Sequence, residues 1–287
     1  MVNNIKRRTR MKKIRIILIM ALAMIMSLTS VKAAENSGVL QIDGSTTVGP
    51  IADAFAEVFK QKYADATFTV KKTGSGDGAA ALIDGRCDIA TMSRFMKGEE
   101  IKKAVDKGVF PTAHAIAMDG VCIVVHPSNP VTNLTKQQIH DIYTGAITNW
   151  KDVGGADVKI VAITRDSSSG TFEVFNEKVM NKDKMAGSVE TVNANPQAQN
   201  RVKSTEGAIG YVGLAFQEGV KTLKVDGVVC TKGTVKQGIY PVSRPLYFFT
   251  NGFPEPGTIK YDFCTFYLSE KGQEIIEAKG FVPFTNY

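Results

Sequence analysis

Short apolar runs with strand character alternate along the chain with segments whose apolar residues repeat at helical spacing. The strand-like runs cover residues 39–42, 67–70, 88–91, 121–125, 159–163 and 246–250. Between the first two runs, Ile51, Phe55, Val58 and Phe59 follow the i, i+4, i+7, i+8 spacing of one helix face. Helices are also expected over 79–83, over 135–143, after residue 170 and over 259–278. This alternation predicts an α/β fold with right-handed crossovers.

Three turns between a predicted strand and a predicted helix are rich in glycine and hydroxyl residues. They cover residues 44–50, 74–78 and 164–173, and the third places Arg165 four to six residues before Ser169, Gly170 and Thr171. A helix N-terminus offers free N–H donors and the positive end of the helix dipole. One such turn is ordinary helix capping. Three of them, together with an arginine, predict that several helix starts converge on one bound oxyanion.

The first 33 residues are typical of an export signal. Seven basic residues precede an uncharged apolar stretch over 16–28, and Val31-Lys32-Ala33 fits a cleavage site loosely. The alternative, a single membrane anchor, needs about 18 or more apolar residues. No cysteine lies near the cleavage site to carry a lipid. We therefore expect an exported protein that is periplasmic, secreted or held at the cell surface.

Removing this leader changes the charge of the chain. The whole sequence carries 35 Lys+Arg and 28 Asp+Glu, and residues 1–33 hold eight of the basic residues and none of the acidic ones. The remainder has 27 basic and 28 acidic residues, a net charge of −1. Nucleic-acid binding thus loses its compositional support. About 254 residues remain, enough for two modest domains.

Cysteines and histidines give no sign of a metal or cofactor site. Cys87, Cys122, Cys230 and Cys264 lack any C-x-x-C spacing, and the three histidines, at 114, 126 and 140, are isolated from one another. An oxidising compartment permits disulfides, and four cysteines allow three pairings that the sequence does not rank. Buried free thiols are an equal alternative.

The three turns, together with segments 134–150, 207–211 and 240–247, resemble the PstS-like phosphate-binding proteins of bacterial phosphate ABC importers. The similarity extends from about residue 38 to about residue 283, and the motifs follow the family's order. The resemblance implies a periplasmic-binding-protein fold (type II-like) with two hinge strands and phosphate in the interlobe cleft. It implies one lobe of residues 34–119 plus 246–287 and another of residues 120–245. It also implies a binding protein, not an enzyme, that delivers phosphate to a membrane permease.

The same resemblance implies a set of phosphate ligands. Those from the first lobe are Ser45, Thr46, Thr47 and Ser75, and those from the second lobe are Arg165, Ser169, Gly170 and Thr171. Asp166 is expected to orient the Arg165 guanidinium so that its fork meets two phosphate oxygens.

One position departs from the family pattern. Some members place an aspartate after the third strand, where it accepts the proton of HPO4²⁻ and disfavours sulfate. Here the segment reads Met92-Ser93-Arg94, with Ser93 at the aspartate position. A serine both accepts and donates, so its penalty against sulfate is weaker than that of an acceptor facing an unprotonated oxygen, on the order of 1–3 kcal/mol or more. Arg94 offers a second positive contact, and Asp77 is a substitute acceptor.

Two other classes of function stay open at this point. One is a binding protein for sulfate or molybdate, or one that serves sensing or adhesion. The other is an exported hydrolase that uses a serine of segment 167–169 as nucleophile. Such a hydrolase needs a positioned base, and no histidine is expected near these serines.

Overall fold

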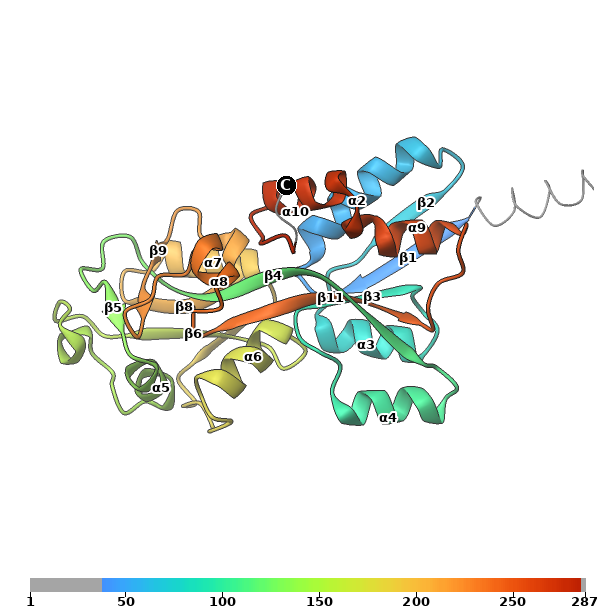
Figure 1. Cartoon of the computed structure of the whole chain (residues 1–287). Coiled ribbons are helices and arrows are strands. Elements are labelled where there is room, and N and C mark those ends of the chain that lie inside the picture. The colour runs from blue at the N-terminus through green and yellow to red at the C-terminus, as the bar shows by residue number, and fades with distance from the viewer. Residues whose placement is uncertain (1–37, 285–287) are drawn as a thin grey trace, which may run out of the picture.

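The computed structural model describes residues 38–284, so the predicted export signal lies outside the described part. Two α/β halves are joined by a pair of long strands (Figure 1). The first half begins with a chain of alternating elements: β1 (Val39–Gly44), α2 (Gly49–Lys62), β2 (Thr67–Val70), α3 (Ser75–Ile83), β3 (Ile89–Met92) and α4 (Gly98–Asp106). β2 and β3 flank β1 in parallel register. The carboxyl ends of these parallel strands therefore meet at one edge, where α2 and α3 begin.

The joining strands are β4 (Pro111–Val125) and β11 (Ser243–Asn251), which run antiparallel from Ser243 opposite Gly120 to Asn251 opposite Pro111. β11 also pairs with β3 of the first half, and the far end of β4 pairs with β8 (Ala208–Gly213) of the second. Nine of the described strands thus form one continuous sheet in the order β2-β1-β3-β11-β4-β8-β6-β7, with β9 beside β4; here β6 is Val161–Arg165, β7 is Glu190–Val192 and β9 is Lys221–Thr222. Two further strands, β5 (Asn133–Leu134) and β10 (Lys224–Val225), form a separate parallel pair.

The second half repeats the alternation of strands and helices. Its larger elements are α5 (Lys136–Thr144), β6 (Val161–Arg165), α6 (Gly170–Lys178), β7 (Glu190–Val192), α7 (Asn195–Lys203) and β8 (Ala208–Gly213). Its shorter elements are β5 (Asn133–Leu134), η1 (Trp150–Val153), η2 (Leu214–Phe216), β9 (Lys221–Thr222), β10 (Lys224–Val225) and α8 (Lys232–Lys236). β6 lies parallel to both β7 and β8.

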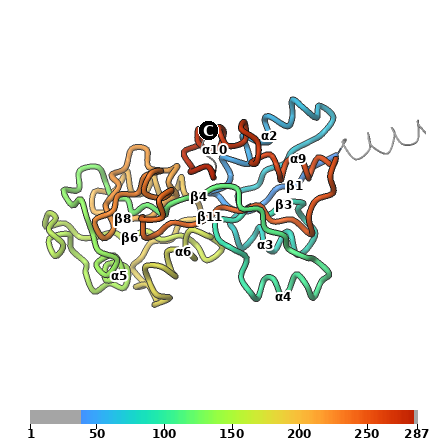
Figure 2. Tube along the Cα trace, viewed as in Figure 1, coloured from blue at the N-terminus to red at the C-terminus, as the bar shows by residue number. Residues whose placement is uncertain are grey.

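The chain then returns to the first half through α9 (Ile259–Thr265), η3 (Phe266–Leu268) and α10 (Glu270–Ala278). Both helices lie beside α2 in the cartoon and in the Cα trace (Figures 1 and 2). Phe55 and Phe59 of α2 pack edge-on or tilted against Phe263 of α9 and Phe266 of η3. The C-terminal segment therefore completes the core of the first half.

Buried apolar residues gather separately in the two halves. One cluster is drawn from residues 121–242 together with Val282. Two further clusters lie in the first half, around α2 and around α3. Each half therefore has a core of its own, and the joining strands pass from one core to the other.

The predicted helices and strands are present, with one difference in the C-terminal segment. The sequence predicts a single helix over 259–278, whereas the structure breaks it at Ser269, whose hydroxyl accepts a hydrogen bond from the Gly272 N–H and caps α10. Helices α4, α7 and α8 were not predicted. None of the helices in residues 38–284 is long and apolar enough to cross a membrane.

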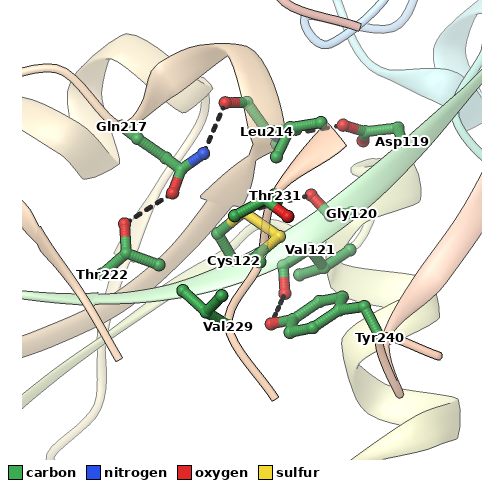
Figure 3. Close-up of a disulfide and its surroundings, with 12 residues drawn as sticks. Asp119, Gly120, Val121, Cys122, Leu214, Gln217, Thr222, Val229, Thr231 and Tyr240 are labelled. Atoms are coloured by element: carbon green, nitrogen blue, oxygen red, sulfur yellow. Dashed lines mark hydrogen bonds between the residues drawn. A yellow bond between two sulfur atoms is a disulfide. The ribbon is translucent and has the colours of Figure 1, made fainter. Parts of the chain in front are cut away.

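The cysteines combine the two alternatives that the sequence left open, since two of them form a disulfide and two are free thiols. Cys122 of β4 forms a disulfide with Cys230, which lies shortly before α8 (Figure 3). Cys87 and Cys264 are buried free thiols. Burial raises the pKa of the Cys87 thiol to about 12 and also raises that of Cys264.

Candidate functional site

The three hydroxyl-rich turns meet between the two halves of the molecule. Thr47, before α2, and Thr171, at the start of α6, place their Oγ1 atoms 3.1 Å apart. The backbone N–H of Gly76 in α3 donates to the Ser168 carbonyl over 2.8 Å. The turns are so close that a Cβ on Gly170 would lie 2.4 Å from the Ser75 Oγ and 2.6 Å from the Ser93 Oγ. The predicted convergence of these helix starts is therefore present in the structure.

Arg165 ends β6 and is 2% exposed. Its Nε donates to the Val192 carbonyl (3.3 Å), and its Nη2 donates to the Asn193 carbonyl (2.7 Å) and to the Thr46 Oγ1 (3.3 Å). Nη1 has no hydrogen-bond partner among residues 38–284. Burial lowers the pKa of Arg165 to about 10, so the guanidinium stays charged at neutral pH.

Asp166 does not take the orienting role that the sequence led us to expect. Its Oδ1 accepts hydrogen bonds from the backbone N–H and the hydroxyl of Ser168. Asp166 thereby fixes the turn before α6, as aspartates in tight turns commonly do. The carbonyls of Val192 and Asn193 hold the Arg165 guanidinium instead.

Asn195, the first residue of α7, links the two threonines of the first turn and is fully buried. Its Nδ2 donates to the Thr46 Oγ1 (3.1 Å) and to the Thr47 Oγ1 (2.8 Å), and its Oδ1 accepts from the Gly213 N–H (3.1 Å). Sequence reasoning missed this residue. The one local signal is an asparagine directly before a proline, which indicates only a turn or a helix start.

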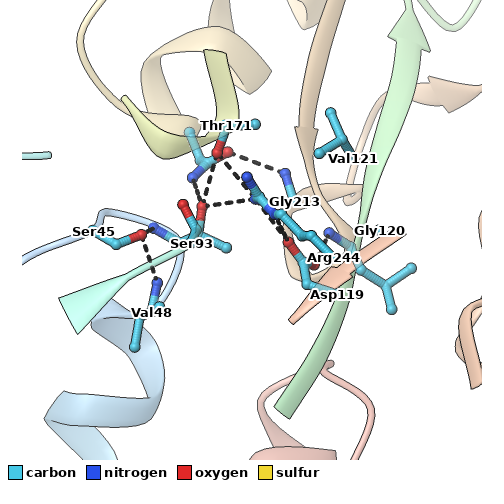
Figure 4. A network of polar contacts seen from close by, with 12 residues as sticks. Ser45, Val48, Ser93, Asp119, Gly120, Val121, Thr171, Gly213 and Arg244 are labelled. Carbon is cyan, nitrogen blue, oxygen red and sulfur yellow. Dashed lines mark hydrogen bonds and ion pairs between the residues drawn. The ribbon is translucent and has the colours of Figure 1, made fainter. Parts of the chain in front are cut away.

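A second arginine approaches the same hydroxyls from β11. Arg244 donates from Nε and Nη2 to the Asp119 Oδ2 over 2.9 and 2.7 Å, and this ion pair is almost fully buried. Its Nη2 also lies 3.0 Å from the Thr171 Oγ1 and 3.3 Å from the Thr47 Oγ1. Figure 4 shows the guanidinium between Asp119 and Thr171. Arg244 is part of the family-like segment 240–247, but its sequence context did not mark it as a site residue.

The segment after β3 is arranged differently from expectation. The Ser75 Oγ accepts a hydrogen bond from the Ser93 N–H (3.0 Å), and the two hydroxyls are 3.4 Å apart. Arg94 is held by Glu100, with Nη1 and Nη2 donating to the two carboxylate oxygens over 2.8 and 2.7 Å. Asp77 is exposed on the first turn of α3. Ser93 thus belongs to the buried site, while Arg94 is neutralised beside it and Asp77 faces solvent.

Ser45 and Ser169 both cap helix starts. The Ser45 Oγ accepts from the N–H groups of Thr47 (3.1 Å) and Val48 (3.3 Å). The Ser169 Oγ accepts from the N–H groups of Thr171 and Phe172, each over 3.2 Å. A hydroxyl whose lone pairs are used in this way keeps its own proton for another acceptor.

The arrangement is therefore rich in donors that are buried where the two halves meet. Hydroxyls, backbone amides of helix starts and two guanidinium groups are present. The most deeply buried carboxylate, Asp119, is already bound to Arg244 and to the Leu214 N–H, whereas the buried Asp166 Oδ2 has no hydrogen-bond partner among residues 38–284. In the described part of the chain, no cluster of His, Cys, Asp and Glu is suited to a metal ion. Such a site is suited to an oxyanion that has lost its hydration shell, because many aligned donors replace the lost water.

Comparison with known proteins agrees with this chemistry. Residues 31–271 match the model of the PBP superfamily domain. The phosphate-binding protein PstS of Staphylococcus saprophyticus is 36% identical over 263 residues, covering 87% of this chain and 82% of the relative. A PstS of Staphylococcus aureus is 35% identical over 258 residues, covering 85% of this chain and 78% of the relative.

Solved structures give the same result. A substrate-binding protein assigned to a phosphate ABC transporter of Clostridium perfringens, solved with bound phosphate, is 36% identical with a TM-score of 0.78, covering 86% of this chain and all of the other. An ABC-type phosphate transport receptor of Vibrio cholerae is 32% identical with a TM-score of 0.70, covering 85% of this chain and 99% of the other. The chain therefore belongs to the PstS family of phosphate-binding proteins within the PBP superfamily.

Proposed function

We propose that this protein captures inorganic phosphate outside the cytoplasm, between two lobes, and delivers it to the permease of a phosphate ABC importer. The observation that carries the proposal is the meeting of three helix starts around the buried Arg165, whose Nη1 has no partner among the described residues. A relative of similar sequence and fold was solved with phosphate bound. The PstS family is a family of transport proteins, not enzymes.

The proposed lobes are residues 34–119 plus 246–287 and residues 120–245. The separate apolar clusters of the two halves support this division. β4 and β11, which pass between the clusters, would serve as the hinge. Phosphate bridging the two lobes would shift the population from open to closed forms. The contacts from Thr47 to Thr171 and from Gly76 to Ser168 would hold the closed form.

We assign the ligands of phosphate by their place in this site. From the first lobe they are Ser45, Thr46, Thr47, Ser75 and Ser93, and from the second lobe they are Arg165, Ser169, Gly170 and Thr171. The Thr46 Oγ1 already accepts from Arg165 and Asn195, so its own proton is left to donate to the anion. Arg94 is withdrawn from the ligand set because Glu100 holds both of its terminal nitrogens.

The second candidate is a binding protein for another tetrahedral oxyanion, such as sulfate. The observation in its favour is the hydroxyl of Ser93 where some relatives have a carboxylate. Among residues 38–284, the Ser93 Oγ contacts only the Ser75 Oγ, at 3.4 Å, so it retains capacity to accept the proton of HPO4²⁻. We therefore favour phosphate. The hydrolase alternative has no support, because His114, His126 and His140 bond to Thr250, Ser128 and the pair Asp141 and Asp183.

The relatives are extracytoplasmic proteins, and so is this one. We propose that the segment 1–33 directs its export and that it resides in the periplasm or at the cell surface. The Cys122–Cys230 disulfide agrees with an oxidising compartment.

Calorimetric titration with phosphate, arsenate and sulfate tests the assignment. Phosphate and arsenate should bind, and sulfate should bind more weakly at a pH where HPO4²⁻ predominates. Arg165→Ala should weaken phosphate binding by about 100-fold or more, since it removes charge-assisted hydrogen bonds in a buried site. The matched control is Arg201→Ala, whose guanidinium pairs with Glu190 at a half-exposed position. Unchanged phosphate affinity in Arg165→Ala would contradict the proposal.

A further inference from the structure

We propose that Arg244 is a second guanidinium ligand of the bound anion and that its engagement depends on lobe closure. This inference rests on the proposed function, since it concerns the same anion site. Arg244 lies on the connecting strand β11, and its carboxylate partner Asp119 lies on the connecting strand β4. The pair is thus placed where the two lobes pivot, and the guanidinium reaches from there into the site.

The first argument for this role is that Arg244 contacts residues of both lobes. One terminal nitrogen, Nη2, donates toward Thr47 of the first lobe (3.3 Å) and toward Thr171 of the second (3.0 Å). These two hydroxyls are themselves 3.1 Å apart. Arg244 therefore contacts both lobes through the residues that we assign to the anion. Opening the lobes separates Thr47 from Thr171, so this nitrogen keeps both contacts only in the closed form.

The second argument is that one nitrogen of Arg244 lacks a hydrogen-bond acceptor. The side chain is 2% exposed, yet Nη1 has no hydrogen-bond partner in the described part of the chain. A buried donor without an acceptor is costly, and native proteins rarely leave one in place without a reason. The guanidinium is planar and rigid, so Nη1 is held next to the nitrogen that contacts the threonines. An anion oxygen between the lobes would supply the missing acceptor.

Arg165 shows the same pattern from the opposite side. It also contacts a first-lobe threonine, Thr46, through Nη2 and leaves Nη1 without a partner among residues 38–284. The two guanidinium groups lie close enough that the charge of Arg244 contributes to lowering the pKa of Arg165, after burial as the main cause. Two cations brought together in a buried space favour an anion between them.

Asp119 explains how the second cation is tolerated. Its Oδ2 accepts from Nε and Nη2, which fixes the plane of the guanidinium and leaves Nη1 without a partner in the described part of the chain. Its Oδ1 accepts from the Leu214 N–H over 2.9 Å. Both carboxylate oxygens thus have hydrogen-bond partners. Asp119 acts here as a positioning residue that holds Arg244, and the guanidinium of Arg244 is the group that would contact the anion.

Arg244 also lines a groove that is open to solvent. An open groove of 610 Å³ runs between the lobes, and its lining includes Arg244, Lys97 and Lys178 together with the acidic residues Glu173 and Glu177. Arg244 thus lies between the groove and the buried threonines. An incoming anion would meet the groove lining before it reaches the closed site.

The test replaces the buried pair by uncharged groups of similar shape. The variant is Asp119→Asn/Arg244→Gln, and the matched control is Glu190→Gln/Arg201→Gln, which removes a surface pair. Calorimetry with inorganic phosphate should give a dissociation constant about 10-fold or more above wild type for the first variant and within about twofold for the control. The loss should be larger at pH 8 than at pH 6, because the dianion gains more from a second cation than the monoanion does.

A pair that only joins the two strands predicts another result. The double variant would then melt at a lower temperature but bind phosphate as tightly as wild type, with an unchanged pH profile, and that outcome overturns the inference. If the double variant does not fold, phosphate binding by the single variant Arg244→Lys tests the inference instead. It keeps the charge near Asp119 but loses the second donor, and we expect weaker phosphate binding, whereas wild-type affinity overturns the inference.

The controls separate this inference from the proposed function. If wild-type protein fails to bind phosphate, the proposed function fails and the inference falls with it. If wild type binds, Arg165→Ala does not, and the Arg244 variants bind like wild type, then only the inference fails.

Discussion

Ser93 is the residue at which the choice between phosphate and sulfate would be made. It is buried beside Ser75, and its hydroxyl has acceptor capacity that the neighbouring threonines lack. Ser93→Asp should favour an anion that carries a proton, because a carboxylate accepts that proton but repels an unprotonated oxygen. We expect the ratio of phosphate to sulfate affinity to rise by about tenfold or more. Competition calorimetry measures this ratio, and Ser93→Ala, which removes the acceptor, should lower it.

Gly170 is required by the close approach of the two lobes. A Cβ at this position would lie 2.4 Å from the Ser75 Oγ and 2.6 Å from the Ser93 Oγ, which is well inside van der Waals contact. Gly170→Ala should therefore hinder closure and weaken phosphate binding by about tenfold or more, since strain of 1–3 kcal/mol is typical of overpacking. The melting temperature without phosphate should change little, because the clash arises between lobes. Wild-type affinity in this variant would contradict the closed arrangement.

At the scale of single elements, α5 carries a pH-dependent contribution to stability. His140 contacts the Asp141 Oδ1 (3.2 Å) and the Asp183 Oδ2 (3.0 Å), and these bonds raise its pKa, with Asp141 as the main cause. A raised histidine pKa stabilises the fold below the unfolded value near 6.5, and this stabilisation is lost as pH rises through the folded pKa. Because Asp183 is exposed and Asp141 is partly exposed, screening by solvent limits the effect to less than about 1 kcal/mol.

His140→Gln should thus lower the melting temperature at pH 5.5 and leave it nearly unchanged at pH 8.5. Differential scanning fluorimetry over this range measures the difference between variant and wild type. A variant that is destabilised equally at both pH values would show that the histidine contributes through packing alone.

The Cys122–Cys230 disulfide ties β4 to the segment before α8 across 108 residues. Cys122→Ala/Cys230→Ala should lower the free energy of unfolding by about 2–4 kcal/mol, mainly because the unfolded chain is no longer constrained. Urea denaturation measures the loss. In the native protein, Cys87 should resist thiol reagents because burial raises its pKa to about 12. After unfolding without reductant, two thiols should react, and four would refute the disulfide.

The elements that could be predicted from the sequence are those with a strong local pattern. The strand-like runs, the amphipathic face of α2 and the Thr135 cap of α5 are all properties of neighbouring residues. Helix α7 was missed because, within residues 195–203, only Asn195, Ala198 and Val202 are buried and the rest of the helix is polar. The break at Ser269 depends on a capping hydrogen bond that competes with continuing the helix.

The residues of the candidate site also fall into those that could be predicted from a local motif and those that could not. The helix starts with their hydroxyls were predictable, because each is a short motif. Arg244 and Asp119 lie 125 residues apart, and Asn195 meets Thr46 from 149 residues away. Such pairs are brought together by the sheet order, and without it neither residue has a partner to suggest its role. The expected bond between Arg165 and its neighbour Asp166 was wrong for a related reason: adjacent residues leaving a strand point in different directions.

At the scale of the whole molecule, the two lobes are also joined at the rim of the groove. The Lys97 Nζ, just before α4, lies 2.6 Å from the Glu173 Oε1 of α6, and both side chains are partly exposed. Since these residues belong to different lobes, the ion pair exists only when the lobes are closed. It should favour closure by about 0.2–1 kcal/mol, the usual range for exposed pairs.

Lys97→Met should therefore raise the dissociation constant for phosphate by a few-fold at most, and the effect should shrink as salt screens the pair. The charge-reversed double variant Lys97→Glu/Glu173→Lys should recover most of the affinity, whereas either reversal alone should not. Lys102→Met is the matched control, because Lys102 pairs with Asp106 within α4 and does not bridge the lobes. If the single and double reversals bind phosphate equally, the pair does not contribute to closure, and other contacts between the lobes, such as those of Thr47 with Thr171 and of Gly76 with Ser168, hold them together.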